Sequence, residues 1–405
     1  MAKVLYISLN GMTEALGESQ VVQYLLDLVK MHAIYLLSFE KQQDQKKYSE
    51  MRTRLEEVGI RWDFFVYSNR YGVLSSIWQV IIALCVLIKW VRREKIEIVH
   101  ARSLIPGVMG LLLKKIFKIK FLFDIRGFAL EEKIVDGRLK RDALLTQILL
   151  KLESLVYKNA DHIVTLTHVS KPIIHERYGV SDHQITVIPT CANPEVFKRM
   201  SAAETLDFRW SLGFDQDDFI LLHSGSVNGW VDFEAECLLF KALHLLHPQI
   251  KWLILNNGQH ESIEALLLKY GVDSGYGLRA ASFKEVYQYL NVADASLFFI
   301  KPCFAKQASA PTKFAENVSC HLFSITNQGY GDMTHYLSEY PDVGLLLDLQ
   351  RVRDDPRGEA QKLWEKLQKR EQPGRFSSLF RVHFSKKTAV GRYDQIYRDL
   401  AGTIR

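Results

Sequence analysis

Mostly apolar runs alternate with helical patterns along the first half of the chain. Residues 3–8 (KVLYIS) are typical of a buried strand, and a helical pattern follows at residues 19–30. Continuous apolar strands that alternate with helices indicate a parallel sheet covered on both faces. Further strands are predicted at residues 33–39, 60–67, 96–100, 120–124, 162–167 and 185–188, and further helices at residues 45–58, 73–93, 106–117, 138–159 and 170–178.

A second alternation begins after a break in this pattern. Pro189, Pro194 and the polar residues 198–207 predict a linker between two domains, and the amphipathic residues 380–400 predict a final helix. Two doubly wound domains in tandem place a cleft between the carboxyl ends of two sheets, where such folds bind ligands. The second domain's strands are predicted at residues 219–223, 252–255, 296–300, 323–326 and 344–347, and its helices at residues 231–246, 261–270, 283–291 and 312–319.

Charge and cysteine usage narrow the function classes. Residues 1–190 hold 27 Lys and Arg against 20 Asp and Glu, whereas residues 191–405 hold 25 against 26. The positive first half predicts a negatively charged partner, such as a phosphate or an anionic membrane, and the excess is too mild to indicate nucleic acid. The five cysteines form no CxxC pair, which favours a reducing cytoplasmic compartment over a zinc site or a disulfide framework.

One segment has to be weighed as a membrane span. Residues 73–91 (VLSSIWQVIIALCVLIKWV) contain Ser75, Gln79 and Lys89, and their longest apolar run covers residues 80–88. A spanning helix needs about 18 consecutive apolar residues. The pattern therefore favours a buried or interface-lying helix, and the basic residues after it leave peripheral docking at the inner membrane face open.

Candidate chemistry in the first domain lies where strands end. Residues 10–20 (NGMTEALGESQ) contain Gly11 and Gly17, and the amides of such a loop suit a phosphate or a sugar hydroxyl, although an ordinary turn with a helix cap explains the loop equally well. Arg102, Asp124 and Arg126 follow two strands and are expected at the cleft mouth. An ion pair of Asp124 with an arginine that braces the loops is the alternative.

The next strand end offers His168 and Lys171 (THVSK). A lone histidine in such a place serves as a structural hydrogen-bonding group in many proteins and as a catalyst in others.

In the second domain, HSGSVNGW provides a turn at Gly225 and Ser226, a second amide-rich site for phosphate. A capped helix with a solvated face is the alternative for the richest stretch, residues 300–320. Its candidate ligands are Lys306, Ser309, Thr312, Lys313 and Glu316.

Taken together, these pieces resemble glycosyltransferase family 4, a large group of retaining enzymes with the two-domain GT-B fold. The resemblance runs from residue 3 to about residue 400, and the order and spacing of the motifs make it specific. The motifs are KVLYISLNGMTEALGESQV, IVHARS, FDIRGF, ADHIVTLTHVSK, ITVIPTCANPEVF, LHSGSVNGW, SFKEVYQYLNVADASLFFIKP and SAPTKFAE.

The resemblance implies an architecture and a set of roles. It implies an acceptor-binding domain at residues 1–190, a nucleotide-sugar-binding domain at residues 191–380, and a helix at residues 381–405 that returns to the first domain. The implied donor residues are Ser282 and Phe283 for the base, Glu316 for the ribose, and Gly225, Ser226, Ser309, Thr312 and Lys313 for the diphosphate. The implied acceptor-side residues are Gly11, Gly17, Arg102 and Lys171, and the catalytic candidates are Asp124, Arg126, His168 and Lys306.

The activity implied is transfer of a hexosyl unit from a UDP- or GDP-sugar to a saccharide or lipid-linked acceptor, with retention, in cell-surface polysaccharide or glycoconjugate synthesis. No metal or cofactor is expected, and no DxD motif stands in a strand-end loop. The chain departs from the family where Ala308 replaces the first of two glutamates and where His321 and Phe323 replace part of a small-Gly-x-Pro pattern. These departures leave a non-catalytic, nucleotide- or partner-binding subunit as the alternative. The sequence lacks the catalytic set of an epimerase and the glycine fingerprint of an NAD-dependent oxidoreductase.

Overall fold

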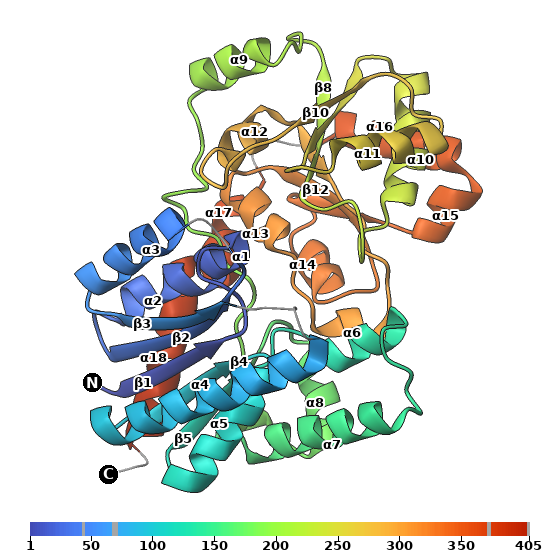
Figure 1. Ribbon diagram of the computed structural model, residues 1–405. Coiled ribbons are helices and arrows are strands. Elements are labelled where there is room, and N and C mark those ends of the chain that lie inside the picture. Colours follow the sequence, from blue (N-terminus) through green and yellow to red (C-terminus); the bar gives the residue numbers. More distant parts are fainter. Residues whose placement is uncertain (43–44, 67–71, 371–373, 403–405) are drawn as a thin grey trace. The chain divides into compact units, whose positions relative to one another are not determined.

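The computed structural model describes residues 1–42, 45–66, 72–370 and 374–402, and the chain divides into two compact units (Figure 1). Unit 1 comprises Met1–Thr190, Ala305–Ser309 and Lys386–Arg405, and unit 2 comprises Cys191–Phe304 and Ala310–Ser385. Within the described residues, each unit has one parallel sheet, of seven strands in unit 1 and six in unit 2. The prediction of two doubly wound α/β domains is confirmed.

The sheet of unit 1 has the strand order β3-β2-β1-β4-β5-β6-β7, so the order reverses between β1 and β4. Its strands are β1 (Lys3–Ser8), β2 (Ala33–Glu40), β3 (Arg61–Val66), β4 (Ile98–Arg102), β5 (Lys120–Asp124), β6 (His162–Thr165) and β7 (Ile185–Val187). Its α-helices are α1 (Ala15–Gly17), α2 (Gln23–Leu28), α3 (Gln45–Glu57), α4 (Gly72–Glu94), α5 (Leu104–Phe117), α6 (Ala129–Val135), α7 (Leu144–Asn159), α8 (Ser170–Tyr178) and α18 (Lys386–Gly402). A π-helical turn, Glu18–Val22, joins α1 to α2.

Alternation along β1 shows how both faces of this sheet are buried. Leu5 and Ile7 pack into one core cluster with residues of α4, α5 and α7. Tyr6 points to the opposite face, where its ring lies 4.2 Å from the ring of His100 and where Tyr397 of α18 bonds to His100. Helix α18 therefore packs against the sheet that contains β1, although the two elements lie at opposite ends of the sequence.

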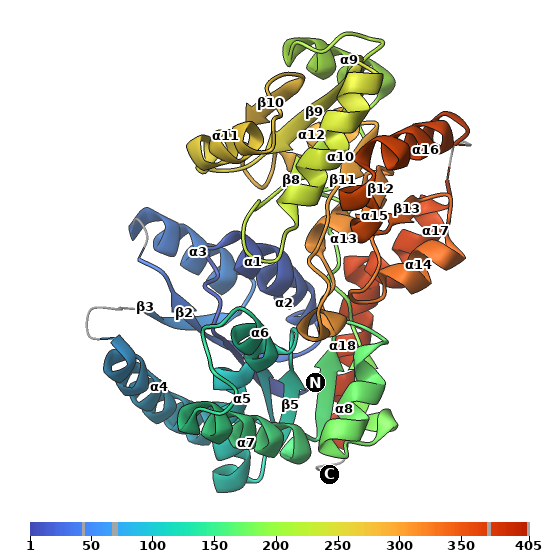
Figure 2. The same ribbon diagram turned by 90° about the vertical axis from the view of Figure 1, so that its right-hand side faces the viewer.

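The sheet of unit 2 has the order β10-β9-β8-β11-β12-β13 and reverses between β8 and β11 (Figure 2). Its strands are β8 (Phe219–Ser224), β9 (Ile250–Leu255), β10 (Tyr276–Arg279), β11 (Ala295–Leu297), β12 (Phe323–Asn327) and β13 (Gly344–Leu347). Its α-helices are α9 (Ala202–Ser211), α10 (Phe233–Leu246), α11 (His260–Lys269), α12 (Val286–Val292), α13 (Thr312–Ser319), α14 (Met333–Glu339), α15 (Leu349–Asp354), α16 (Pro356–Gln368) and α17 (Phe376–Leu379). Among the described helices, none combines the length and the apolar content that crossing a bilayer requires.

Some predicted elements are wrong in extent. Residues 198–207 are not a plain linker, because α9 begins within them and is capped by Ser201 and Glu204, each side chain accepting the other's backbone N–H. The helix predicted at residues 138–159 begins at Leu144, and the sequence interpretation missed β10, α6, α14, α15 and α16. Tyr67 and residues 403–405, which end two predicted segments, lie outside the described residues.

A buried acid in unit 1 makes the stability of the protein depend on pH. The Glu153 carboxylate accepts a hydrogen bond of 2.9 Å from the Tyr178 hydroxyl, and burial raises the pKa of Glu153 to about 7. Below the ordinary pKa of a glutamate, Glu153 is protonated in the folded and in the unfolded protein, so its burial carries no charge penalty. As the pH rises from there to about 7, the unfolded protein loses the proton of Glu153 more readily than the folded protein does, and the free energy of unfolding falls. We expect Glu153→Gln to raise the free energy of unfolding by roughly 2 kcal/mol at pH 8 and to leave it unchanged at pH 4.5, as measured by urea denaturation.

Candidate functional site

A pocket of about 530 Å³ lies in unit 2 at the carboxyl ends of β8, β9 and β10. Open α/β sheets bind ligands at this edge, beside the point where the strand order reverses. The N-terminal end of α13 forms one wall of the pocket, and no side chain caps this helix. The lining residues are Ser224, Gly225, Ser226, Leu255, Asn256, Asn257, Gln259, Ala281, Val286, Pro311, Thr312, Lys313 and Glu316.

Lys313 brings a buried positive charge to this pocket. Its Nζ atom is shielded from solvent and has no hydrogen-bond partner among the described residues. The ammonium lies 5.4 Å from the centre of the Phe298 ring, and burial lowers the pKa of Lys313 against the attraction of Glu236 and Glu316. An unpaired buried ammonium is costly, so its position next to a cavity favours an anionic ligand that supplies the missing partner.

Glu316 stands one turn further along α13 and provides the acceptor group of the pocket. Burial raises the pKa of Glu316 to about 7, and Lys313 offsets part of that effect. Within the described part of the chain, no hydrogen-bond donor contacts its carboxylate, so both oxygens remain for a ligand. A carboxylate can accept bonds from two vicinal hydroxyl groups, as the ribose of a nucleotide presents them.

The turn after β8 lies next to the Lys313 ammonium. Gly225 has a φ of 101°, a conformation that favours glycine, and a Cβ at this residue would lie 4.0 Å from Nζ of Lys313. The Asn256 side chain fixes the turn by donating a hydrogen bond of 2.8 Å to the Gly225 carbonyl. The sequence interpretation missed Asn256 and Asn257, although two asparagines before a glycine at a strand end were a visible signal.

Other predicted donor residues lie beside the pocket or away from it. The N–H and hydroxyl of Ser282 both donate to Glu285, so neither is free to read a base, and Phe283 packs edge-on against Phe197. Ser309 clusters with unit 1 and is not a lining residue. The predicted catalytic Lys306 also belongs to unit 1, where its ammonium donates a hydrogen bond of 2.7 Å to Glu132.

The predicted N-terminal residues Arg102, Asp124 and Arg126 meet in a buried charge cluster of unit 1. The Oδ2 atom of Asp124 lies 3.5 Å from Arg102 and 3.9 Å from Arg126, and it accepts a hydrogen bond from Tyr393. Burial opposes ionisation of Asp124, but Arg126, His100 and Arg102 together outweigh it and hold the pKa of Asp124 below its usual value. Because the Asp124 side chain is fully buried, its geometry matches the bracing ion pair more closely than an open catalytic acid.

The loop with Gly11 and Gly17 is closed by a buried carboxylate. Glu40 accepts hydrogen bonds from the N–H of Met12 at 2.6 Å and from the N–H of Thr13 at 3.2 Å. These two amides therefore already have an acceptor and are not open to a phosphate. A Cβ on Gly17 would lie 1.8 Å from the Gly11 carbonyl oxygen, so the loop needs glycine at this position.

Gly17→Ala is therefore expected to break the packing of this loop. The added methyl group clashes with backbone rather than with a flexible side chain, which should lower the free energy of unfolding by about 2–4 kcal/mol. Urea denaturation followed by circular dichroism measures the change. Gly391→Ala in α18 is a matched control, because a Cβ there meets no atom within 4 Å. Equal stability of the two variants would contradict the close approach.

The remaining predicted residues of unit 1 lie near α8. The Lys171 ammonium forms an ion pair of 3.1 Å with Asp182, and the backbone carbonyl of His168 accepts a hydrogen bond from the Lys171 N–H. The His168 side chain is exposed. Among the described residues, no group of three or more His, Cys, Asp and Glu side chains lies close enough to hold a metal ion.

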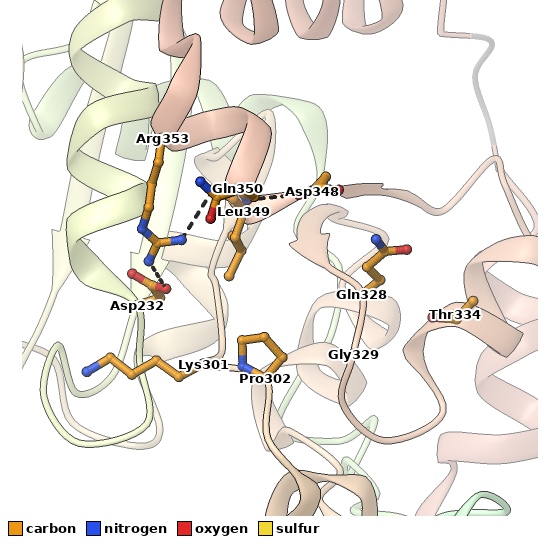
Figure 3. A pocket seen from close by; sticks show the side chains of 10 residues that line it. All are labelled: Asp232, Lys301, Pro302, Gln328, Gly329, Thr334, Asp348, Leu349, Gln350 and Arg353. Atoms are coloured by element: carbon orange, nitrogen blue, oxygen red, sulfur yellow. Dashed lines mark hydrogen bonds and ion pairs between the residues drawn. The ribbon is translucent and has the colours of Figure 1, made fainter.

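A second pocket of unit 2, about 600 Å³, lies at the carboxyl ends of β11, β12 and β13 (Figure 3). Its charged groups already have partners. Asp232 pairs with Arg353, Asp348 accepts bonds from the backbone of α15, and Lys301 donates to the Gly229 carbonyl. Because the first pocket keeps an unpaired ammonium and an open carboxylate, it is the stronger candidate for an anionic ligand.

Several known proteins resemble this chain in sequence or in fold. The family model described as Glycosyltransferase Family 4 matches residues 19–196, and no curated protein matches the sequence. Among solved structures, sucrose-phosphate synthase from Thermosynechococcus elongatus is 14% identical with a TM-score of 0.69, and 100% of both chains is covered. HepE from Anabaena, in complex with UDP and glucose, is 14% identical with a TM-score of 0.69 over 98% of this chain and 99% of HepE. A glycosyltransferase from Rickettsia africae is 14% identical with a TM-score of 0.70 over 98% of each chain. The predicted resemblance and the GT-B fold are confirmed.

Proposed function

We propose that this chain, a glycosyltransferase similar to family 4 with the GT-B fold, transfers a hexosyl unit from a UDP- or GDP-sugar to a saccharide or lipid-linked acceptor. The observation that carries the proposal is the pocket at α13, where an unpaired buried ammonium and an open carboxylate stand one helical turn apart. These groups match the diphosphate and the ribose of one ligand. The complex of HepE with UDP and glucose, on the same fold, supports this choice of donor.

The proposed chemistry follows from the charge that develops during transfer. When the bond between sugar and diphosphate breaks, negative charge grows on the leaving diphosphate and positive charge on the sugar ring. The Lys313 ammonium and the uncapped N-terminal end of α13 stabilise the diphosphate, which lowers the barrier without a divalent metal. The leaving diphosphate can itself take the proton of the acceptor hydroxyl, which is consistent with retention at the anomeric carbon.

The acceptor belongs to unit 1 in this proposal. The positive charge excess of residues 1–190 favours an acceptor that carries phosphate or sits at an anionic surface. Synthesis of a cell-surface polysaccharide or glycoconjugate at the cytoplasmic face of a membrane would use such an acceptor.

The family departures do not obstruct the pocket. Ala308 packs in the core of unit 1, and Phe323 is buried at the start of β12. His321, with a φ of 58°, stacks on Phe376 at a ring distance of 5.3 Å, and its ring nitrogens contact Arg199 and Ser377. None of the three residues lines the pocket at α13. These departures from the family pattern therefore give no reason to prefer a non-catalytic subunit to an enzyme.

A thermal-shift panel of UDP, GDP, ADP and their sugars tests the proposal. One nucleoside diphosphate should raise the melting temperature at sub-millimolar concentration, and added EDTA should leave that shift unchanged. Release of the nucleoside diphosphate from the matching sugar nucleotide, followed by coupled assay, then distinguishes an enzyme from a non-catalytic subunit. No shift with any member of the panel would contradict the assignment of the donor pocket.

A further inference from the structure

Helix α4 presents apolar side chains on its outer side as well as on its inner side. Ala83, Leu87 and Trp90 pack into the core of unit 1. On the opposite side, Trp78 is 62% exposed and Ile81 is 46% exposed, and Ile82 beside them is also exposed. A surface helix normally carries polar residues on its outer stripe. The exposed side of this part of α4 therefore favours contact with an apolar partner over contact with water.

Two neighbouring helices repeat the same feature. On α5, the exposed apolar side chains are Ile105, Leu112 and Ile116, spaced so that they share one side of the helix. On α7, the corresponding side chains are Leu144, Leu145, Ile148 and Leu155. We call the outward sides of α4, α5 and α7 the outer helix face.

These three helices form one layer on the same face of the sheet. Helix α5 packs against both α4 and α7, and residues of all three enter one core cluster (Figures 1 and 2). At one end of the layer, the Arg92 guanidinium lies 5.4 Å from the centre of the Phe117 ring, which joins α4 to α5. The exposed apolar side chains thus lie on one layer of helices, and clustered apolar side chains on a protein surface mark interaction sites.

Positive charges are interleaved with the apolar side chains. Lys89 follows Trp78 and Ile82 on the same stripe of α4, Lys115 stands beside Ile116, and Lys151 lies between Ile148 and Leu155. None of these three lysines forms an ion pair with a described residue. Apolar side chains rimmed by lysine suit the boundary between the acyl chains and the anionic head groups of a bilayer.

A third pocket, which lies in unit 1, adjoins this face. It holds about 340 Å³ at the carboxyl ends of β1 and β2, and Ile105 and Val80 line it from α5 and α4. Lys133 also lines the pocket and forms no ion pair with a described residue, whereas the Lys41 ammonium is paired with Glu14, another lining residue. The pocket therefore combines Ile105, which also belongs to the outer helix face, with the unpaired ammonium of Lys133, which suits a phosphate-bearing head group.

We infer that the outer helix face docks on an anionic lipid bilayer and that the acceptor enters the pocket of Ile105 and Lys133 from that bilayer as a phosphate-bearing lipid. The acceptor part of this inference rests on the proposed glycosyl transfer, whereas the docking part stands on the surface itself. Docking keeps the lipid tail among apolar side chains while its polar head reaches the strand ends of unit 1.

Co-sedimentation of the full chain with vesicles tests the inference. Vesicles of phosphatidylcholine with 30% phosphatidylglycerol should bind the protein, and 0.5 M NaCl should reduce the binding by at least tenfold because salt screens the lysines. The double variant Trp78→Gln, Ile81→Gln should bind at least tenfold more weakly. The matched control is Leu245→Gln, Leu268→Gln, which changes two side chains of unit 2 that are 72% and 74% exposed, and it should bind like the natural chain.

Further readouts separate the outcomes. A thermal shift with the nucleoside diphosphate that the natural chain binds shows that each variant is folded, and this shift should survive in both double variants. Absence of vesicle binding at low salt would overturn the docking inference while leaving the donor pocket intact. A dimer in size-exclusion chromatography that Trp78→Gln, Ile81→Gln dissociates would also overturn it, since a second copy would then cover the face.

Discussion

Replacing Glu316 by alanine is expected to weaken the binding of a nucleoside diphosphate by at least about 100-fold. The open carboxylate would accept hydrogen bonds from two ribose hydroxyls, and a hydrogen bond to a charged group contributes about 1.5–3 kcal/mol. Glu316→Gln keeps one acceptor oxygen but loses the charge. Its affinity for the nucleoside diphosphate should lie between that of the natural chain and that of Glu316→Ala. The fold should tolerate both changes, because no described side chain depends on this carboxylate for a hydrogen bond.

Isothermal titration calorimetry with the nucleoside diphosphate identified by thermal shift measures this effect. The matched control is Glu264→Ala, which removes an exposed carboxylate from α11. The control should bind like the natural chain. An unchanged affinity of Glu316→Ala, with the ligand still protecting the protein thermally, would place the ribose elsewhere.

Replacing Lys313 by methionine should have effects of opposite sign on stability and on binding. Methionine keeps an unbranched apolar chain next to the Phe298 ring and removes a buried ammonium that lacks a hydrogen-bond partner. The unliganded protein should therefore gain about 1 kcal/mol in free energy of unfolding. Binding of the diphosphate should weaken by about 10- to 100-fold, because a charge-assisted contact is lost.

A comparison of the nucleoside with its diphosphate isolates the contribution of Lys313. Affinity for the nucleoside alone should be the same in the natural chain and in Lys313→Met, while affinity for the diphosphate falls. Lys284→Met, which removes an exposed ammonium just before α12, serves as the control for lost surface charge. An equal loss for the nucleoside and the diphosphate would mean that Lys313 does not face the phosphates.

The pocket at α13 was predictable wherever one helix or turn carried the signal. Helix α13 begins and ends where the sequence pattern placed it, and Gly225, Thr312, Lys313 and Glu316 line one pocket. The sequence could not show that Nζ of Lys313 lacks a partner, because that depends on what the fold packs around it. Asn256 and Asn257 were visible as two asparagines before a glycine at a strand end, but their hydrogen bonds to Gly225 and Ala281 join residues far apart in sequence and were not predictable.

The fold was predictable where apolar strands alternate with helices and less so elsewhere. Helix α9 was mistaken for linker because its composition is polar, although Ser201 and Glu204 have the spacing of a capping box. The strand β10 escaped because its residues, Tyr276–Arg279, are mostly half-exposed and lack a continuous apolar run. Residues 305–309 cluster with unit 1 although both flanking segments belong to unit 2, and no local pattern predicts such an exchange.

A crystal structure of the protein soaked with its sugar nucleotide would show whether the pocket at α13 is the donor site. We expect the ribose hydroxyls to contact the Glu316 carboxylate and the diphosphate to lie between the Gly225 turn, Nζ of Lys313 and the first amides of α13. Density for the nucleotide in the pocket of Asp232 and Arg353, with Lys313 still unpaired, would contradict this assignment.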